Sequence, residues 1–202
     1  MELEHKITTP GGNLDPDLLI RQALEAGLAD EAGEAIEDLI ATDPGHHEGW
    51  FLQGVRGLLL GHCAEAADSF AHALARGADP RQAGLGRAMA LLRAERPTDA
   101  WTSLTDLLED EPGDHEILHW LIRTGIALER WDDLAEHLES HLSLRSDDHA
   151  ARFAYAGVSL RLGRPAIARA QYDRLRAEAA DLVGLDDLGD ILEPETLAAS
   201  AA

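Results

Sequence analysis

The sequence predicts an all-α solenoid built from five consecutive helix–turn–helix repeats of 34 residues each. Three observations lead to this fold class. A six-residue pattern recurs at 34-residue intervals, each interval contains two helical patterns, and an acidic residue followed by proline stands at several junctions between intervals. Repetition at a fixed period of this length is typical of helical arrays, in which each repeat buries its apolar face against its neighbours.

The recurring pattern is clearest at 27–32, which reads Gly-Leu-Ala-Asp-Glu-Ala, and at 61–66, which reads Gly-His-Cys-Ala-Glu-Ala. The same slot reads Gly-Arg-Pro-Ala-Ile-Ala at 163–168, and 95–100 and 129–134 are weaker copies. A large apolar residue follows each copy: Ile36, Phe70, Leu104, Leu138 and Tyr172. This register sets the repeats at 13–46, 47–80, 81–114, 115–148 and 149–182.

Proline and its preceding residue mark where the helices are expected to begin. Asp15-Pro16, Asp43-Pro44 and Asp79-Pro80 lie at junctions between repeats, where a capping residue and a proline end one helix and start the next. Pro97 and Pro165 occupy the same slot at the start of a second helix. Proline is tolerated there because its missing N–H would have no partner within the helix anyway.

The second repeat gives the sequence its family resemblance, through five spaced residues: Trp50, Gly54, Ala66, Phe70 and Ala73. They resemble the consensus of the tetratricopeptide-repeat family, and the resemblance covers roughly 13–182. It implies a right-handed α-solenoid, in which small residues such as Gly54 and Ala66 face each other and let the helix axes approach. The fourth repeat departs most, with Ile122 and Leu134 where the family has small residues.

The two ends of the chain are expected to differ from the repeats. Residues 1–12, which include two consecutive glycines, are predicted to be a flexible lead. The segment 183–202 carries Leu185, Leu188, Ile191 and Leu192 among acidic residues. Helical repeat arrays need a terminal element with one polar face, so this segment is predicted to form a short capping helix and then a disordered tail.

The resemblance also implies a binding site, because the first helices of tetratricopeptide repeats line a concave surface that contacts partners. Transferred to this register, the partner-binding residues are Arg21, Phe51, Val55, Leu85, Met89, Arg93, His119, Arg123, Phe153 and Arg161. An apolar strip edged by arginine suits a protein or peptide segment with apolar anchors and a few carboxylates. The alternative is that many of these side chains pack between repeats and leave only a shallow groove.

The charge of the chain argues against several classes of partner. There are 38 acidic and 17 basic residues, which gives a formal net charge of −21. Such a polyanion is repelled by phosphate backbones and anionic lipid headgroups, so neither nucleic acid nor a membrane is the expected partner. Cys63 is the single cysteine, the first residues lack the apolar run of a signal peptide, and no apolar stretch has membrane-spanning length. A cytoplasmic protein is predicted.

One motif offers a different function. His115-Glu116-Ile117-Leu118-His119 is an H-E-x-x-H sequence, in which two histidines one helical turn apart can ligate zinc and the glutamate can act as a general base. However, the chain has ten histidines, so a chance match is common, and His115 falls in the first turn of its helix. His137 and His141 have the same spacing on the next expected helix, from which a third ligand would have to come, or from the helix before. No metal and no cofactor are predicted, and the lone histidines are expected to be exposed.

The predicted function is therefore a non-enzymatic protein–protein interaction module, such as a scaffold or a chaperone-like escort, that binds a partner segment in its groove. Two alternatives stay open at this point. One is a zinc-dependent hydrolase centred on residues 115–119. The other is a structural repeat protein that associates with itself, with a neighbour's tail in the groove.

Overall fold

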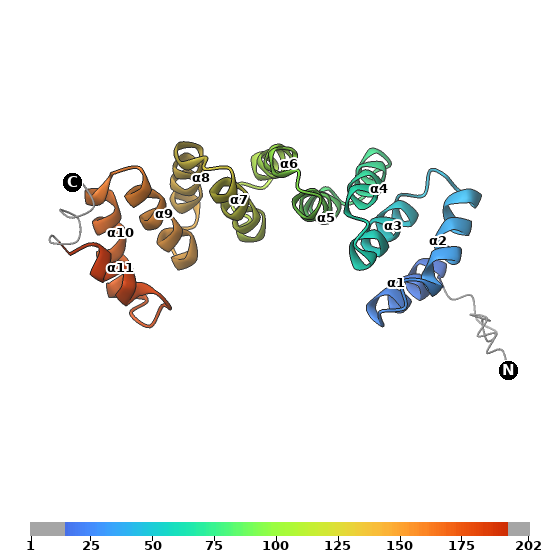
Figure 1. Cartoon of the computed structure of the whole chain (residues 1–202), viewed down its shortest axis with the longest axis horizontal. Helices are drawn as coiled ribbons and strands as arrows, with labels where there is room; N and C mark the ends of the chain where they lie inside the picture. The colour runs from blue at the N-terminus through green and yellow to red at the C-terminus, as the bar shows by residue number, and fades with distance from the viewer. Residues whose placement is uncertain (1–14, 194–202) are drawn as a thin grey trace. The chain divides into compact units, whose positions relative to one another are not determined.

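The computed structural model describes residues 15–193 of the 202-residue chain, and this part contains eleven α-helices and no strand (Figure 1). The predicted all-α repeat class is confirmed. The predicted lead at 1–12 and the tail beyond residue 193 lie outside the described residues. The chain divides into two compact units, Met1–Glu95 and Arg96–Ala202, which are described separately as unit 1 and unit 2. Every helix in the described part is too short or too polar to cross a membrane.

Unit 1 is organised around its third helix. Its helices are α1 (Pro16–Glu25), α2 (Glu31–Thr42), α3 (His47–Leu60), α4 (Cys63–Ala75) and α5 (Pro80–Arg93). Helix α3 packs against each of the other four. The first three helices share a core in which Ile20, Ile36 and Leu52 are buried.

The helices begin largely where the sequence places caps. Pro16 and Pro80 are the first residues of α1 and α5, and the preceding aspartates accept hydrogen bonds from backbone N–H groups. Asp43-Pro44 lies at the junction between α2 and α3. Asp43 ends α2, and α3 begins only at His47, after His46 Nδ1 accepts a hydrogen bond of 3.2 Å from the N–H of Gly49. Pro44 therefore lies in the loop between α2 and α3 and does not itself start a helix.

The turn between the two helices of each pair repeats the 34-residue period in the backbone. Residues 27, 61, 95, 129 and 163 all have positive φ, between 56° and 80°. Three of them are glycine, but Glu95 and Glu129 are not, and a side chain in this left-handed region is strained. The next residue's N–H commonly reaches back into the helix, as from His62 to the carbonyl of Gly57 at 2.8 Å, which is the hydrogen bond of a Schellman cap.

Phe70 on α4 shows why small residues recur in α3 and α5. Its side chain is 1% exposed. A Cβ atom added at Gly54 would lie 2.8 Å from the ring, and one added at Gly86 would lie 2.7 Å from it. Gly57, rather than Gly54, is the glycine that approaches Ala66, at 2.9 Å by the same measure. The expected pairing of Gly54 with Ala66 is thus shifted by one helical turn.

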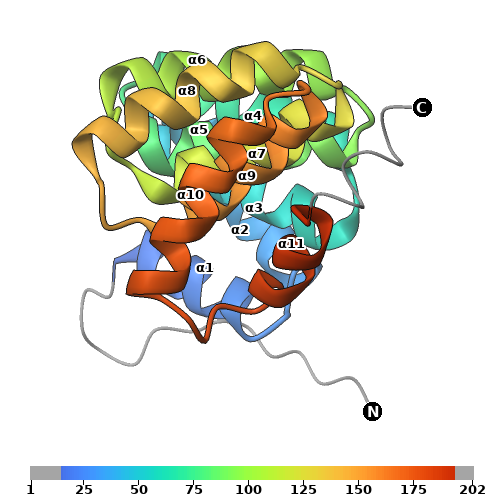
Figure 2. The ribbon, with the colours of Figure 1, turned by 90° about the vertical axis from the view of Figure 1, so that its left-hand side faces the viewer.

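Unit 2 consists of α6 (Pro97–Asp110), α7 (His115–Ala127), α8 (Trp131–Leu144), α9 (His149–Arg161), α10 (Pro165–Glu178) and α11 (Leu185–Ile191). Helices α9, α10 and α11 are in the foreground of Figure 2. Leu188 and Leu192 form a buried cluster with Ala156 of α9 and Ala168 of α10. The short helix α11 thereby covers the apolar end that the α9/α10 pair would otherwise expose.

Candidate functional site

The predicted binding residues of α1 and α3 contact one another in unit 1. Arg21 forms an ion pair with Glu48 on α3, and its guanidinium carbon lies 5.7 Å from the centre of the Phe51 ring. Phe51 packs edge to face against Phe70, with 5.6 Å between ring centroids. These side chains connect α1, α3 and α4, so part of their surface already stabilises the fold.

The other predicted residues of unit 1 differ in how much surface they offer. Leu85 is only 6% exposed, because it belongs to the core, and it presents little to a partner. Val55 packs against the core cluster of the first three helices, and Met89 is half-buried. Arg93 is exposed, and its Nη1 donates to the carbonyl of Leu58 at 3.4 Å. Leu85 therefore packs between helices, as the alternative to an open groove expects, and it is not available as a binding residue.

In unit 2, a first hollow lies between α7 and α9 and has a volume of ≈490 Å³. We call it the α7/α9 hollow. Its residues are His115, Glu116, Leu118, His119 and Ile122 from α7, and Asp148, Ala150, Ala151 and Ala154 from the start of α9. The small side chains of α9 leave the space, and His119 is the predicted binding residue that lines it. The H-E-x-x-H sequence therefore forms one wall of a surface hollow.

The H-E-x-x-H sequence was the candidate metal site. Within residues 15–193, no group of three or more His, Cys, Asp or Glu side chains is placed to hold a metal ion. His137 on α8 packs against Trp101, with ring centroids 5.8 Å apart. His141 on the same helix is 1% exposed and contacts Asp148. Among the described residues, the two histidines of the motif are not joined by a third side chain placed as in a three-ligand zinc site.

A second hollow lies between α9 and α11 and has a volume of ≈450 Å³. We call it the α9/α11 hollow. It is lined by Phe153, Gly157, Leu160 and Arg161 from α9, and by Gly184, Asp187, Leu188 and Ile191 at and just before α11. A Cβ atom added at Gly157 would have no neighbour within 4 Å, so this position opens into the hollow. Two predicted binding residues, Phe153 and Arg161, lie together here.

The arginines near these hollows have aromatic partners. The guanidinium carbon of Arg161 lies 5.7 Å from the ring centre of Trp131, and that of Arg123 lies 5.0 Å from the ring centre of Trp120. A guanidinium over a ring keeps its N–H donors free to bind a carboxylate at its edge. Arg123 lines neither hollow, whereas Phe153 and Arg161 line the α9/α11 hollow.

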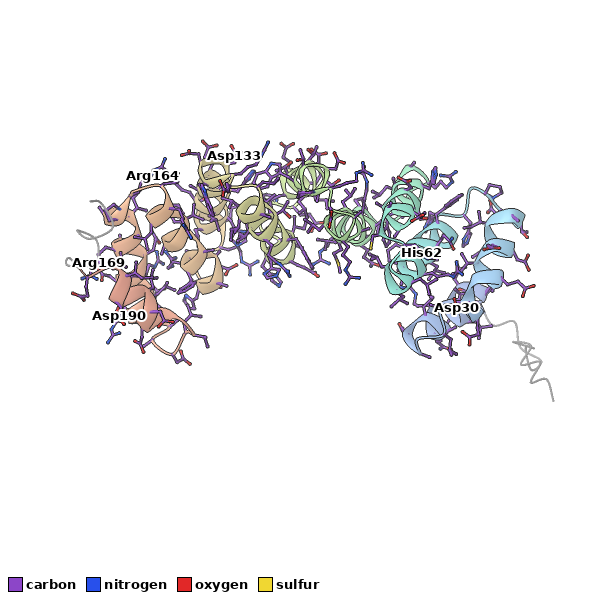
Figure 3. All side chains as sticks on the ribbon, viewed as in Figure 1. Asp30, His62, Asp133, Arg164, Arg169 and Asp190 are labelled. Carbon is purple, nitrogen blue, oxygen red and sulfur yellow. The ribbon has the colours of Figure 1, made fainter. Side chains whose placement is uncertain are left out.

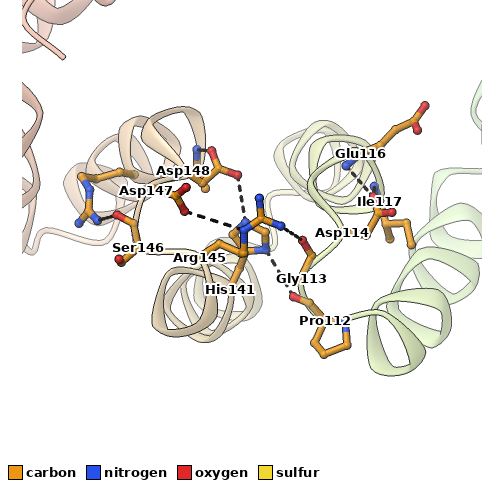
Figure 4. Close-up of polar contacts among 12 residues, drawn as sticks. Pro112, Gly113, Asp114, Glu116, Ile117, His141, Arg145, Ser146, Asp147 and Asp148 are labelled. Atoms are coloured by element: carbon orange, nitrogen blue, oxygen red, sulfur yellow. Dashed lines mark hydrogen bonds and ion pairs between the residues drawn. The ribbon is translucent and has the colours of Figure 1, made fainter. Parts of the chain in front are cut away.

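His141 joins the loop before α7 to the start of α9 (Figure 4). Its Nε2 lies 3.0 Å from Asp148 Oδ2, and its Nδ1 lies 3.4 Å from the carbonyl oxygen of Pro112. Asp148 also accepts a hydrogen bond of 2.9 Å from the N–H of Ala151 as the cap of α9. Burial raises the pKa of the Asp148 carboxyl, but the hydrogen bonds from Ala151 and His141 outweigh burial and hold the pKa below its usual 3.8.

No protein-family model and no curated protein matches this sequence, but solved structures do. YrrB, described as a TPR protein with an unusual peptide-binding site, is 13% identical, with a TM-score of 0.70 over 89% of this chain and 92% of its own. MamA from Desulfovibrio magneticus is 16% identical, with a TM-score of 0.65, and the match covers 84% of this chain and 98% of MamA. PilF of Pseudomonas aeruginosa is 17% identical, with a TM-score of 0.64, and the match covers 92% of this chain and 86% of PilF. This chain has the tetratricopeptide-repeat fold.

Helices α7 and α9 fall in the expected repeats 115–148 and 149–182, and each of the two hollows lies beside at least one of them. The sequence did not predict two contacts between an arginine side chain and a backbone carbonyl group of an earlier loop. Arg145 Nη1 lies 3.5 Å from the carbonyl oxygen of Gly113, and Arg76 Nε lies 2.6 Å from that of Pro44. Both arginines follow the last residue of a second helix and reach back 32 residues. Arg76 and Arg145 share a place directly after a helix, but they are offset by one residue in the 34-residue register, so the repeat pattern alone did not pair them.

Proposed function

We propose that this protein is a non-enzymatic interaction module that binds a segment of a partner protein along α9 in unit 2. The observation that carries the proposal is the pair of hollows on either side of α9, the α7/α9 hollow and the α9/α11 hollow. His119, Phe153 and Arg161 line them. A peptide can place one anchor in each hollow while its backbone crosses the helix between them.

The chemistry of the two hollows suggests what the partner segment contains. In the α9/α11 hollow, Phe153, Leu160 and Ile191 provide an apolar wall, and Ile191 is 48% exposed. Arg161 adds a positive charge, which favours a carboxylate next to an apolar anchor. The α7/α9 hollow is lined by His115 and His119, whose rings carry polar nitrogens, and by three alanines of α9. The partner segment is therefore amphipathic, with apolar anchors and at least one acidic residue.

The kind of partner is supported by the fold and by the chain's charge. YrrB shares the fold and is described as having a peptide-binding site. A net charge of −21 repels nucleic acid and anionic lipid, which leaves a protein segment as the partner that the hollows suit best. A scaffold or a chaperone-like escort would both use such a surface.

A bulky substitution at Gly157 tests the proposal. Peptides are first selected from a displayed library against the full chain, and their affinities are then measured by fluorescence anisotropy. Gly157→Leu places an isobutyl group in the α9/α11 hollow, where nothing else lies within 4 Å of the added Cβ, so the fold tolerates it and the peptide does not. We expect at least about a tenfold loss of affinity, which corresponds to about 1.4 kcal/mol.

The matched control adds the same side chain elsewhere on unit 2. Ala177 on α10 is exposed and lines none of the hollows described here, so Ala177→Leu should bind the selected peptides as the wild type does. Circular dichroism at 222 nm checks that both variants remain helical. If the selected peptides bind Gly157→Leu with unchanged affinity, the assignment of the partner to α9 is wrong.

A further inference from the structure

A third hollow in unit 2 is lined by α8, α9 and α10, and it has a volume of ≈530 Å³. We call it the α8/α10 hollow. Leu142 comes from α8, Arg152 and Tyr155 come from α9, and Ile167 and Gln171 come from α10. None of these residues lines the two hollows of the proposed function, so this site stands independently of it.

Arg152 is the unusual residue of this hollow, because it is a buried cation without a carboxylate partner. Arg152 is 4% exposed. Nη1 donates to Gln171 Oε1 at 2.8 Å, and Nη2 donates to the carbonyl oxygen of Ser146 at 2.5 Å. Nε is buried and has no hydrogen-bond partner in the described structure. The hydrogen bonds of Arg152 therefore go only to neutral oxygens, and Glu178 acts on its charge without a direct contact.

A buried charge without an opposite charge is costly, because the low-dielectric surroundings replace water without returning a counter-charge. Burial, and then the nearby charge of Arg174, lower the pKa of the Arg152 guanidinium, while Glu178 opposes them. Natural proteins pair buried charges or use them to bind ions of opposite sign. The position of Arg152 in the wall of a hollow favours the second use.

The fifth repeat, which contains Arg152, carries a net positive charge in an otherwise acidic chain. Residues 149–182 contain six arginines and three acidic residues, a net charge of +3, whereas the remaining residues contain 11 basic and 35 acidic residues, a net charge of −24. Figure 3 labels two of these arginines, Arg164 and Arg169. Arg164 pairs with Asp132 at 2.8 Å, and Arg169 pairs with Asp173 at 3.8 Å. Arg152 is buried and has no such pair.

We propose that the α8/α10 hollow binds the side-chain carboxylate of an Asp or Glu residue in a segment of a partner protein. The carboxylate takes the place of Gln171 Oε1 on the Arg152 guanidinium. Neighbouring apolar side chains of the segment lie against Leu142 and Ile167, the latter 36% exposed. Glu139, which also lines the hollow, and the acidic remainder of the chain disfavour polyanions such as nucleic acid.

The test follows Arg152 directly in the full chain labelled with ¹⁵N. The probe is the peptide acetyl-Ala-Leu-Glu-Leu-Ala-amide, and its control has Gln in place of Glu. The Nε–H signal of Arg152 is assigned by its loss in Arg152→Lys. We expect the Glu peptide to shift this signal with saturation and the Gln peptide to bind at least about tenfold more weakly, as loss of a charge-assisted hydrogen bond predicts.

An internal carboxylate provides a second test. Gln171→Glu places a carboxylate where Gln171 Oε1 now accepts from Arg152, so it should raise the melting temperature and abolish binding of the Glu peptide. Gln171→Met removes the amide without adding charge, and it should keep the binding.

The proposal is overturned if the Glu peptide leaves the Arg152 signal unmoved or if Gln171→Glu binds the Glu peptide normally. It is also overturned if raising the protein concentration alone shifts the signal, since the occupant is then a second copy of this chain. Gly157→Leu should leave this binding unchanged, which separates it from the proposed function.

Discussion

The packing of Phe70 between two glycines gives the most direct test of the structure, through Gly86→Ala. An alanine in the middle of a helix normally stabilises it by about 1 kcal/mol relative to glycine, because the unfolded chain loses freedom. At Gly86 the new Cβ would lie 2.7 Å from Cε1 and Cζ of Phe70. Carbon atoms in contact prefer separations of about 3.5–4.0 Å, so the ring must move by nearly 1 Å.

The ring has no room to move away from Gly86. Gly54 approaches it from α3, with 2.8 Å between an added Cβ and Cε1, and Phe70 is only 1% exposed. Overpacking of this kind costs about 1–3 kcal/mol, and the upper part of that range applies where the side chain is confined by neighbouring helices. After subtraction of the helix-propensity gain, we expect Gly86→Ala to lower the free energy of unfolding by about 1–2 kcal/mol.

The matched control is Gly157→Ala, where the same atom is added in mid-helix with no neighbour within 4 Å. It should raise stability by about 0.5–1 kcal/mol. Urea unfolding followed by circular dichroism at 222 nm measures both variants. Phe70→Leu combined with Gly86→Ala should be less destabilised than the sum of the two single changes, because the clash is removed. A Gly86→Ala protein that is as stable as Gly157→Ala would refute the reasoning.

Three further predictions concern the turns and caps. Glu129→Gly should raise the unfolding free energy by about 1 kcal/mol, because Glu129 has φ of 56°. Gly61→Ala at the equivalent turn should lower the unfolding free energy. Unchanged thermal unfolding of both variants would contradict this prediction. Asp79→Ala should cost about 1 kcal/mol in urea unfolding, since Asp79 Oδ1 accepts from Gln82 at 2.7 Å, and a loss below experimental error would show that the cap is dispensable. Because the folded-state pKa of Asp148 lies below 3.8, its carboxylate stabilises the protein above about pH 4 and stops doing so as the pH falls through the folded-state pKa. Asp148→Asn, which can still cap α9, should therefore lose less stability than the wild type between about pH 5 and 3; equal acid sensitivity would contradict the role of the carboxylate.

Local sequence patterns determined most of the helical architecture. The 34-residue spacing of the repeated pattern reappears in the backbone as positive φ at 27, 61, 95, 129 and 163. Asp79-Pro80 begins a helix as predicted, because capping depends on hydrogen bonds between residues three positions apart or fewer. Asp43-Pro44 does not, since His46 supplies the cap of the following helix instead. Where two local caps compete, the sequence alone leaves the boundary open.

The candidate site could be predicted only in part. The family register brought His119, Phe153 and Arg161 to the hollows beside α9, because residues at fixed repeat positions share a helix face. It also named Leu85, which the core of unit 1 buries. A helical period shows which residues share a face, but it does not show which neighbouring side chains cover that face.

By itself, the sequence determined the helix class, the period of the repeat and several helix starts, all of which depend on residues close together along the chain. Only the tertiary structure decided that His141 is buried against Asp148 and that Arg152 is buried without a carboxylate. Both side chains belong to polar residue types that are usually exposed, and their burial follows from helices that pack over them. Burial and charge pairing depend on distances between separate helices, and those distances are fixed when the helices pack.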